Sequence, residues 1–87
     1  MRREQQQRLQ TESRVDWFAI LDALNRRGLN TTMIAVEVEI PRATILGWKQ
    51  GREPCHADGE RLVGLWLRMT GEARDALPMT NRPPWLD

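Results

Sequence analysis

The sequence predicts a small all-α domain, and two kinds of pattern support this prediction. Apolar residues recur at intervals of three and four in two segments, which is the spacing of the buried face of an amphipathic helix. The two stripes are Trp17, Ile20, Leu21 and Leu24, and Leu62, Leu65, Trp66 and Met69. The two-residue alternation of a half-buried strand occurs in a single segment, 36–40. A strand without a partner would leave its backbone donors and acceptors unpaired, so helices are favoured throughout.

The composition is typical of one soluble globular domain. The chain has 87 residues, of which 29% are charged and 40% hydrophobic, and its formal net charge is +1. No apolar run approaches the roughly 20 residues of a membrane-spanning helix, and the basic N-terminus lacks the apolar block of a signal peptide. The single cysteine, Cys55, cannot form an internal disulfide. We therefore expect a reducing, cytoplasmic location.

The first and last helices of the domain are delimited by capping signals. We predict a helix over about 14–27, with Ser13 as N-cap and Asp16 in its first turn, and with Gly28 in a left-handed exit. A second long helix is predicted over 57–69, where Gly59 and Gly64 lower the helix propensity.

The segments outside these helices complete the predicted organisation. A short helix is expected at 71–77, and Pro78 would end it. Residues 1–12 are polar and lack an apolar stripe, so we expect a flexible arm or a helical extension. The Pro-containing residues 78–87 are expected to form an extended tail, which leaves 13–77 as the domain.

The segment between the two long helices is best explained as two short helices. Asn30 is a favourable N-cap, and Ile34, Ala35 and Val38 then share one helical face. Pro41 suits the start of the next helix, because its missing N–H would have no partner there. We predict helices over about 31–38 and 41–50, with Ile45 and Trp48 facing inward. Together with the segments above, this gives five helices.

Residues 29–54 resemble the helix-turn-helix of the lambda repressor/Cro-like (XRE-type) DNA-binding family. With Thr31 as the first position, that motif has apolar residues at positions 4, 8, 10, 15 and 18 and a small residue at position 5. This sequence supplies Ile34, Val38, Ile40, Ile45 and Trp48, with Ala35 as the small residue. The sequence at 51–54, Gly-Arg-Glu-Pro, resembles the family's glycine-x-x-proline exit. One departure is Glu39, which stands where the family usually has a left-handed glycine.

The resemblance implies a compact five-helix, lambda-repressor-like fold that binds duplex DNA. It places the helix over 41–50 in the major groove and assigns base reading to Arg42, Ala43, Thr44 and Gly47. Arg42 is the best candidate for reading guanine, because its guanidinium can bond O6 and N7 together. The implied phosphate contacts are Asn30, Thr31, Thr32, Lys49, Gln50 and Arg52.

The implied function is sequence-specific transcriptional regulation by a small phage or prophage repressor-like protein. One helix contacts too few base pairs for selective binding, so we expect a homodimer on a pseudo-palindrome. The candidate dimer or partner surface is Met69, Leu77, Met79, Trp85 and Leu86. An alternative is a protein-interaction or assembly module, in phage packaging or replication or as an antitoxin, that keeps the motif as a scaffold. The small, apolar outward side chains of 41–50 favour this alternative.

The sequence gives no indication of catalysis, of a metal or of a cofactor. Cys55 and His56 are adjacent, but no second pair is present to complete a tetrahedral metal site. The acidic residues show no pairing typical of a catalytic site, and no glycine-rich phosphate loop is present. We therefore expect that the protein is not an enzyme.

Overall fold

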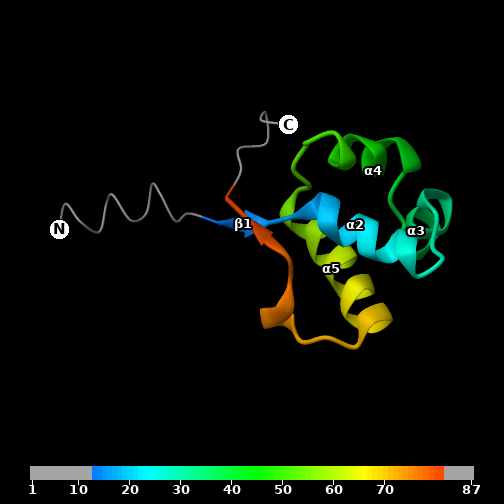
Figure 1. Cartoon of the computed structure of the whole chain (residues 1–87). Coiled ribbons are helices and arrows are strands. Elements are labelled where there is room, and N and C mark those ends of the chain that lie inside the picture. Colours follow the sequence, from blue (N-terminus) through cyan, green and yellow to red (C-terminus); the bar gives the residue numbers. More distant parts are fainter. Residues whose placement is uncertain (1–12, 82–87) are drawn as a thin grey trace, which may run out of the picture.

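The computed structural model describes residues 13–81, and these form four α-helices, a single 3-10 turn and a two-stranded sheet (Figure 1). In chain order the elements are β1 (Arg14–Val15), α2 (Trp17–Arg26), α3 (Thr31–Val38), α4 (Arg42–Lys49), α5 (His56–Thr70), the 3-10 turn η1 (Arg74–Ala76) and β2 (Met79–Thr80). The predicted helical class is therefore correct in outline, whereas the predicted count of five helices is wrong. The arm 1–12 and the tail beyond residue 81 lie outside the described residues.

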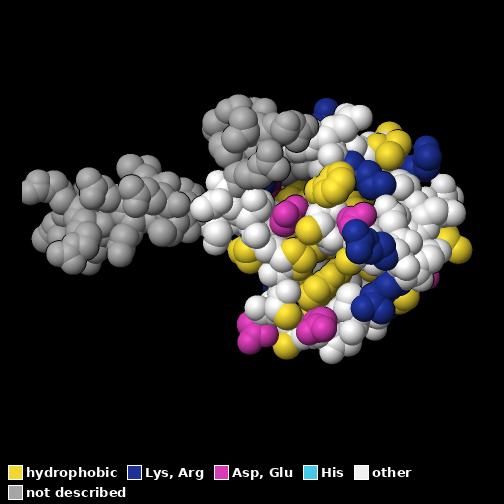
Figure 2. Space-filling view, in the orientation of Figure 1, with side chains coloured by type: hydrophobic (Ala, Val, Ile, Leu, Met, Phe, Trp, Pro, Cys, Tyr) yellow, Lys and Arg dark blue, Asp and Glu magenta, His cyan; other side chains and the backbone are white. Residues whose placement is uncertain are grey.

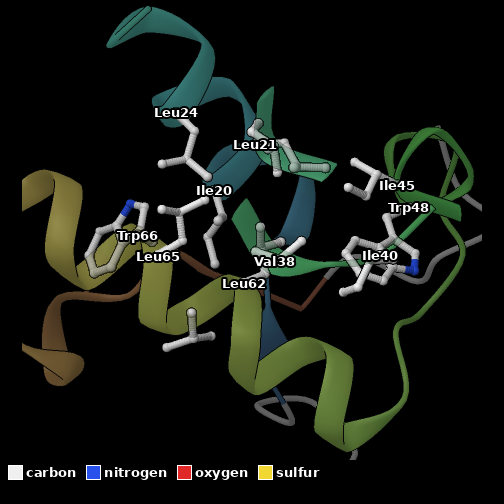
Figure 3. Close-up of a cluster of buried hydrophobic side chains, with 12 residues drawn as sticks. Ile20, Leu21, Leu24, Val38, Ile40, Ile45, Trp48, Leu62, Leu65 and Trp66 are labelled. Atoms are coloured by element: carbon white, nitrogen blue, oxygen red, sulfur yellow. The ribbon is translucent and has the colours of Figure 1, made fainter. Parts of the chain in front are cut away.

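The four helices enclose one apolar core. Helix α2 packs on α4 and α5, and α3 packs on the same two helices. Ile40, Ile45 and Trp48 lie at one end of the cluster and Trp66 lies at the opposite end (Figure 3). The buried hydrophobic residues are Ile20, Leu21, Leu24, Ile34, Val38, Ile40, Ile45, Trp48, Leu62, Val63, Leu65 and Trp66. The two apolar stripes read from the sequence supply half of this set, and the inward positions predicted for 31–38 and 41–50 supply Ile34, Val38, Ile45 and Trp48.

The start of α2 differs from the prediction. Asp16, and not Ser13, is the N-cap, and its Oδ1 accepts a hydrogen bond of 3.0 Å from the N–H of Ala19. The chain before Asp16 is therefore extended, and β1 pairs antiparallel with β2 through Arg14–Thr80 and Val15–Met79. The N–H of Asp16 also donates to the carbonyl of Pro78, at 2.9 Å. The first residues of the predicted tail thus pair with the start of the domain.

The predicted fifth helix is reduced to the single turn η1. Gly71 ends α5 in a left-handed conformation, with φ of 72°. At the other end, Pro78 disfavours a helical conformation of Leu77, which has ψ of 136°. Only a few residues remain between these two breaks, and they form one 3-10 turn, closed by a 2.9 Å bond from the Ala76 N–H to the Ala73 carbonyl.

The two glycines inside α5 have different surroundings. Gly59 is buried against Trp17, and a Cβ added to it would lie 2.9 Å from Cη2 of that indole. The ring is also held by a 3.2 Å hydrogen bond from its Nε1 to Glu53. A Cβ added to Gly64 would meet nothing within 4 Å. Gly59 is therefore required for the close approach of α2 and α5, and Gly64 is not.

The two glycine-to-alanine variants should consequently differ in stability. Gly64→Ala should raise the free energy of unfolding by up to about 1 kcal/mol, because alanine has the higher helix propensity. Gly59→Ala should lower it by about 1 kcal/mol or more, because the indole must be displaced. Urea denaturation followed by circular dichroism measures both. An equal gain from the two substitutions would contradict the packing at Gly59.

An ion pair links η1 to α5. Nη2 of Arg74 lies 2.6 Å from Oε1 of Glu60. The hydrogen bond from the Arg74 guanidinium, aided by its charge, holds the pKa of the Glu60 carboxyl below its ordinary value. Because this pKa is lower in the folded state, the pair contributes stability above the ordinary carboxyl pKa. That contribution is lost as the pH falls through the folded pKa.

We expect Glu60→Gln to make the protein less sensitive to acid. The variant should be less stable than the wild-type protein at pH 7, and the difference should shrink at a strongly acidic pH, below the lowered pKa of the wild-type Glu60 carboxyl. Thermal unfolding of the two proteins at both pH values measures this difference. A difference that stays constant with pH would exclude the Glu60 carboxylate as its origin.

No helix within residues 13–81 is long and apolar enough to cross a membrane.

Candidate nucleic-acid interface

Helices α3 and α4 are joined by a tight turn at 39–41. Glu39 has a left-handed conformation, with φ of 60° and ψ of 45°, which places Ile40 in the core. The N–H of Ile40 donates to the carbonyl of Ala35, at 3.1 Å. Glu39 thus adopts the conformation for which glycine is preferred, with the strain that a Cβ adds there.

A residue from another helix supports this turn. Nη1 of Arg61, on α5, donates to the carbonyl oxygen of Val38 at 3.2 Å and approaches that of Glu39 at 3.5 Å. A cation at the C-terminus of α3 also interacts favourably with the helix dipole. Arg61 is not among the residues predicted from the sequence, because nothing in its local pattern connects it with a carbonyl two helices away.

Helix α4 is held by two side chains and leaves its other side open. Ile45 and Trp48 are buried, as predicted, and Figure 3 shows both in the core cluster. Leu46 is half-buried. The helix begins at Arg42 with Pro41 as its N-cap, and Pro41 supplies no capping side chain. The N–H groups of Arg42 and Ala43 therefore lie in the first turn, where no helix carbonyl can satisfy them.

The four predicted base-reading residues are placed differently. Arg42 and Ala43 are exposed at the start of α4, whereas Thr44 and Gly47 are half-buried. Ala43 and Gly47 are four residues apart and so share one face of the helix. Gly47 is in contact range of a long side chain, since a Cβ added to it would lie 3.5 Å from Cδ of Arg52.

The segment between Glu39 and Glu53, which contains α4, is positively charged. Residues 40–52 contain Arg42, Lys49 and Arg52 and no acidic residue. The ion pairs within residues 13–81 are Arg14–Glu53, Arg26–Asp22 and Arg74–Glu60, so none involves these three cations. In Figure 2 the visible Lys and Arg side chains lie on the right-hand half of the molecule, which carries α2, α3, α4 and the end of α5 in Figure 1. The site can therefore attract an anion.

The predicted phosphate contacts fall at both ends of the α3–turn–α4 unit. Asn30 is the N-cap of α3, as predicted, and its Oδ1 accepts from the Met33 N–H at 2.8 Å. Thr31 is half-buried and Thr32 is exposed, both in the first turn of α3. Gln50 and Arg52 are exposed after α4. The first turn of α3 offers free backbone N–H groups and the positive end of the helix dipole.

Lys49 differs from the other cations of this surface because it has a partner in the domain. Its Nζ donates to Oδ1 of Asn25, at 3.2 Å, and Nδ2 of Asn25 donates to the Leu29 carbonyl at 2.7 Å. These bonds tie the end of α4 to the end of α2. Contact of Lys49 with a phosphate would compete with this arrangement.

The described residues of the predicted dimer or partner surface differ in exposure. Met69 is 38% exposed near the end of α5, and Met79 is 52% exposed on β2. Leu77 is partly buried against the core of its own chain. Trp85 and Leu86 lie outside the described residues.

Two further features bear on the chemistry of the site. No group of three or more His, Cys, Asp and Glu side chains within residues 13–81 is placed to hold a metal ion. Glu53, after α4, pairs with Arg14 of β1 and accepts from Nε1 of Trp17. This contact connects the chain after α4 to the N-terminal side of the domain. It could not be predicted from local sequence patterns, because its residues are far apart in the sequence.

Comparisons with protein-family models, with curated proteins and with solved structures found no match. The functional assignment therefore rests on the geometry of α3 and α4.

The strain at Glu39 can be tested directly. Glu39→Gly should raise the free energy of unfolding by about 1 kcal/mol, because glycine adopts a positive φ without the Cβ penalty. Glu39→Ala removes the same carboxylate but retains the Cβ, so it should give no such gain. Urea denaturation of both variants separates the two effects. Equal stability of the variants would show that the turn is not strained.

Proposed function

We propose that this protein binds duplex DNA through α4 in the major groove and acts as a transcriptional regulator. The observation that carries the proposal is the α3–turn–α4 unit. Ile45 and Trp48 fix α4 to the core, while Arg42 and Ala43 at its start remain exposed. An α-helix fits the width of the major groove of B-DNA, and in helix-turn-helix proteins the N-terminal residues of the second helix contact the bases.

The charge around α4 supports the same proposal. Arg42 and Arg52 are exposed and form no ion pair within residues 13–81. Neutralisation of phosphates by such cations supplies most non-specific affinity for DNA. The exposed N-terminus of α3, with Thr31 and Thr32, adds donors suited to phosphate oxygens.

Selective binding requires more contacts than one copy of α4 can make. A dimer on two half-sites, about 34 Å apart along one face of the duplex, would double the number of base pairs read. A small phage or prophage repressor is a protein of this type.

A second candidate function is a protein-interaction or assembly module. The observation that favours it is the outward side of α3, where Met33 is 47% exposed and Val36 is 71% exposed, three residues apart on one face. In this case α3 and α4 would serve as scaffold, since a fold by itself does not determine a function.

The salt dependence of binding separates these functions. We expect the full chain to bind a duplex selected from a randomised pool more tightly than a scrambled duplex. The logarithm of the binding constant should fall linearly with the logarithm of the salt concentration, by about 0.9 per phosphate contact. Arg42→Ala should lower the preference for the selected duplex by about 1–3 kcal/mol, because a bidentate contact to guanine is lost. Fluorescence anisotropy at several salt concentrations measures both quantities.

A matched variant controls for the loss of charge. Arg68→Ala also removes one exposed arginine, but from the end of α5, and should leave the preference between duplexes unchanged. If the protein showed no affinity for DNA at low salt, the proposed function as a DNA-binding regulator would be rejected, and a protein partner that binds α3 would be favoured.

A further inference from the structure

Three helix ends in this domain share one backbone arrangement. A residue with positive φ follows the helix, and the N–H of the next residue bonds to a carbonyl five positions earlier. The positive-φ residues are Gly28, Glu39 and Gly51, with φ of 95°, 60° and 106°. The bonds are Leu29 to Leu24 (3.1 Å), Ile40 to Ala35 (3.1 Å) and Arg52 to Gly47 (3.0 Å). This is the Schellman motif, in which the donor residue commonly packs its side chain back on the helix.

The third motif differs from the others in the side chain that it positions. Leu29 and Ile40 are apolar and pack against or within the core. Arg52 is exposed, and its side chain lies over Gly47: a Cβ added there would be 3.5 Å from Cδ and 3.7 Å from both Nε and Nη1. The arginine therefore occupies the space into which a side chain at position 47 would project.

This placement brings the guanidinium to the face of α4 on which Ala43 lies. Gly47 is four residues after Ala43 and three after Thr44, so the three positions share one side of the helix. Within residues 13–81 the Arg52 guanidinium has neither an ion pair nor a side-chain hydrogen bond. Its donors remain available, while the side chain lies over Gly47 and the backbone is fixed by two hydrogen bonds at Gly51 and Arg52.

We propose that Arg52 is a base-reading residue, which supplies the side chain that α4 lacks at Gly47. This inference rests on the proposed function and changes the role expected of Arg52 from phosphate contact to specificity. A guanidinium held on the groove-facing side of α4 presents a planar fork to the O6 and N7 acceptors of guanine. Glycine at position 47, although unfavourable in a helix, leaves room for the arginine to lie close to the helix axis.

The test compares two substitutions of Arg52 on a panel of duplexes. The panel contains the duplex selected by the full-length wild-type protein and its single-base-pair substitutions. Arg52→Ala and Arg52→Lys should both reduce the discrimination between bases at the same single base pair, by about ten-fold or more. Alanine removes the guanidinium, and lysine keeps the charge but lacks the planar guanidinium that can form two hydrogen bonds to guanine. Arg52→Lys should retain the salt dependence of the wild-type protein, and Arg42→Ala should affect a different base pair. Circular dichroism checks that each variant is folded.

Three other results would overturn the inference. A uniform loss of affinity on all duplexes in Arg52→Ala, restored in Arg52→Lys, would identify a phosphate contact and leave the proposed function intact. If Arg52→Ala lowered the stability of the protein but left DNA binding unchanged, the role of Arg52 would be structural, at the C-terminal end of α4. Absence of binding by the wild-type protein at low salt would remove both this inference and the proposed function.

Discussion

The rest of this structure depends on the burial of Ile45 and Trp48 at one end of the core. Helices of eight residues, such as α3 and α4, are not stable alone in water, since too few hydrogen bonds follow a costly nucleation. Packing of α4 on α2 and α3 therefore determines both that α4 forms and which of its sides is open. The orientation of Arg42 and Ala43 toward solvent is a consequence of the inward position of Ile45 and Trp48. The packing of Ile45 and Trp48 therefore both completes the hydrophobic core and determines which residues the candidate interface exposes.

A second constraint is the way in which the chain leaves its helices. The left-handed residues Gly28, Glu39 and Gly51 reverse the chain after α2, α3 and α4. Two of these reversals return an apolar residue to the core, and the third returns an arginine to the outer face of α4. Arg61 and the Glu53–Arg14 contact then connect these turns to distant elements. The site is thereby supported by residues that would not themselves touch a ligand.

Most of the helical framework could be predicted from the sequence, because its signals are local. Apolar spacing located the helices, and Asn30 and Gly28 were correctly assigned to a helix start and a helix end. A strand at 36–40 is disfavoured because it would have no partner for its backbone hydrogen bonds, and in the structure these residues form the end of α3 and the following turn. The errors are the N-cap, the fifth helix and the sheet. The sheet and the shifted N-cap go together with the pairing of β1 and β2, which joins the two ends of the domain and cannot be read from either end alone. The fifth helix is shortened by Gly71 and Pro78, which leave only a few residues between them.

For the candidate site, the sequence by itself determined which residues belong to α4 and which of them face inward, because a period of 3.6 residues fixes the side of a helix on which each position lies. It also determined the charge of the segment. Only the tertiary structure decided that Lys49 is bonded to Asn25, that Arg61 supports the turn and that Arg52 lies over Gly47. These contacts join residues across helices or around a chain reversal, and their geometry depends on packing that no local pattern records.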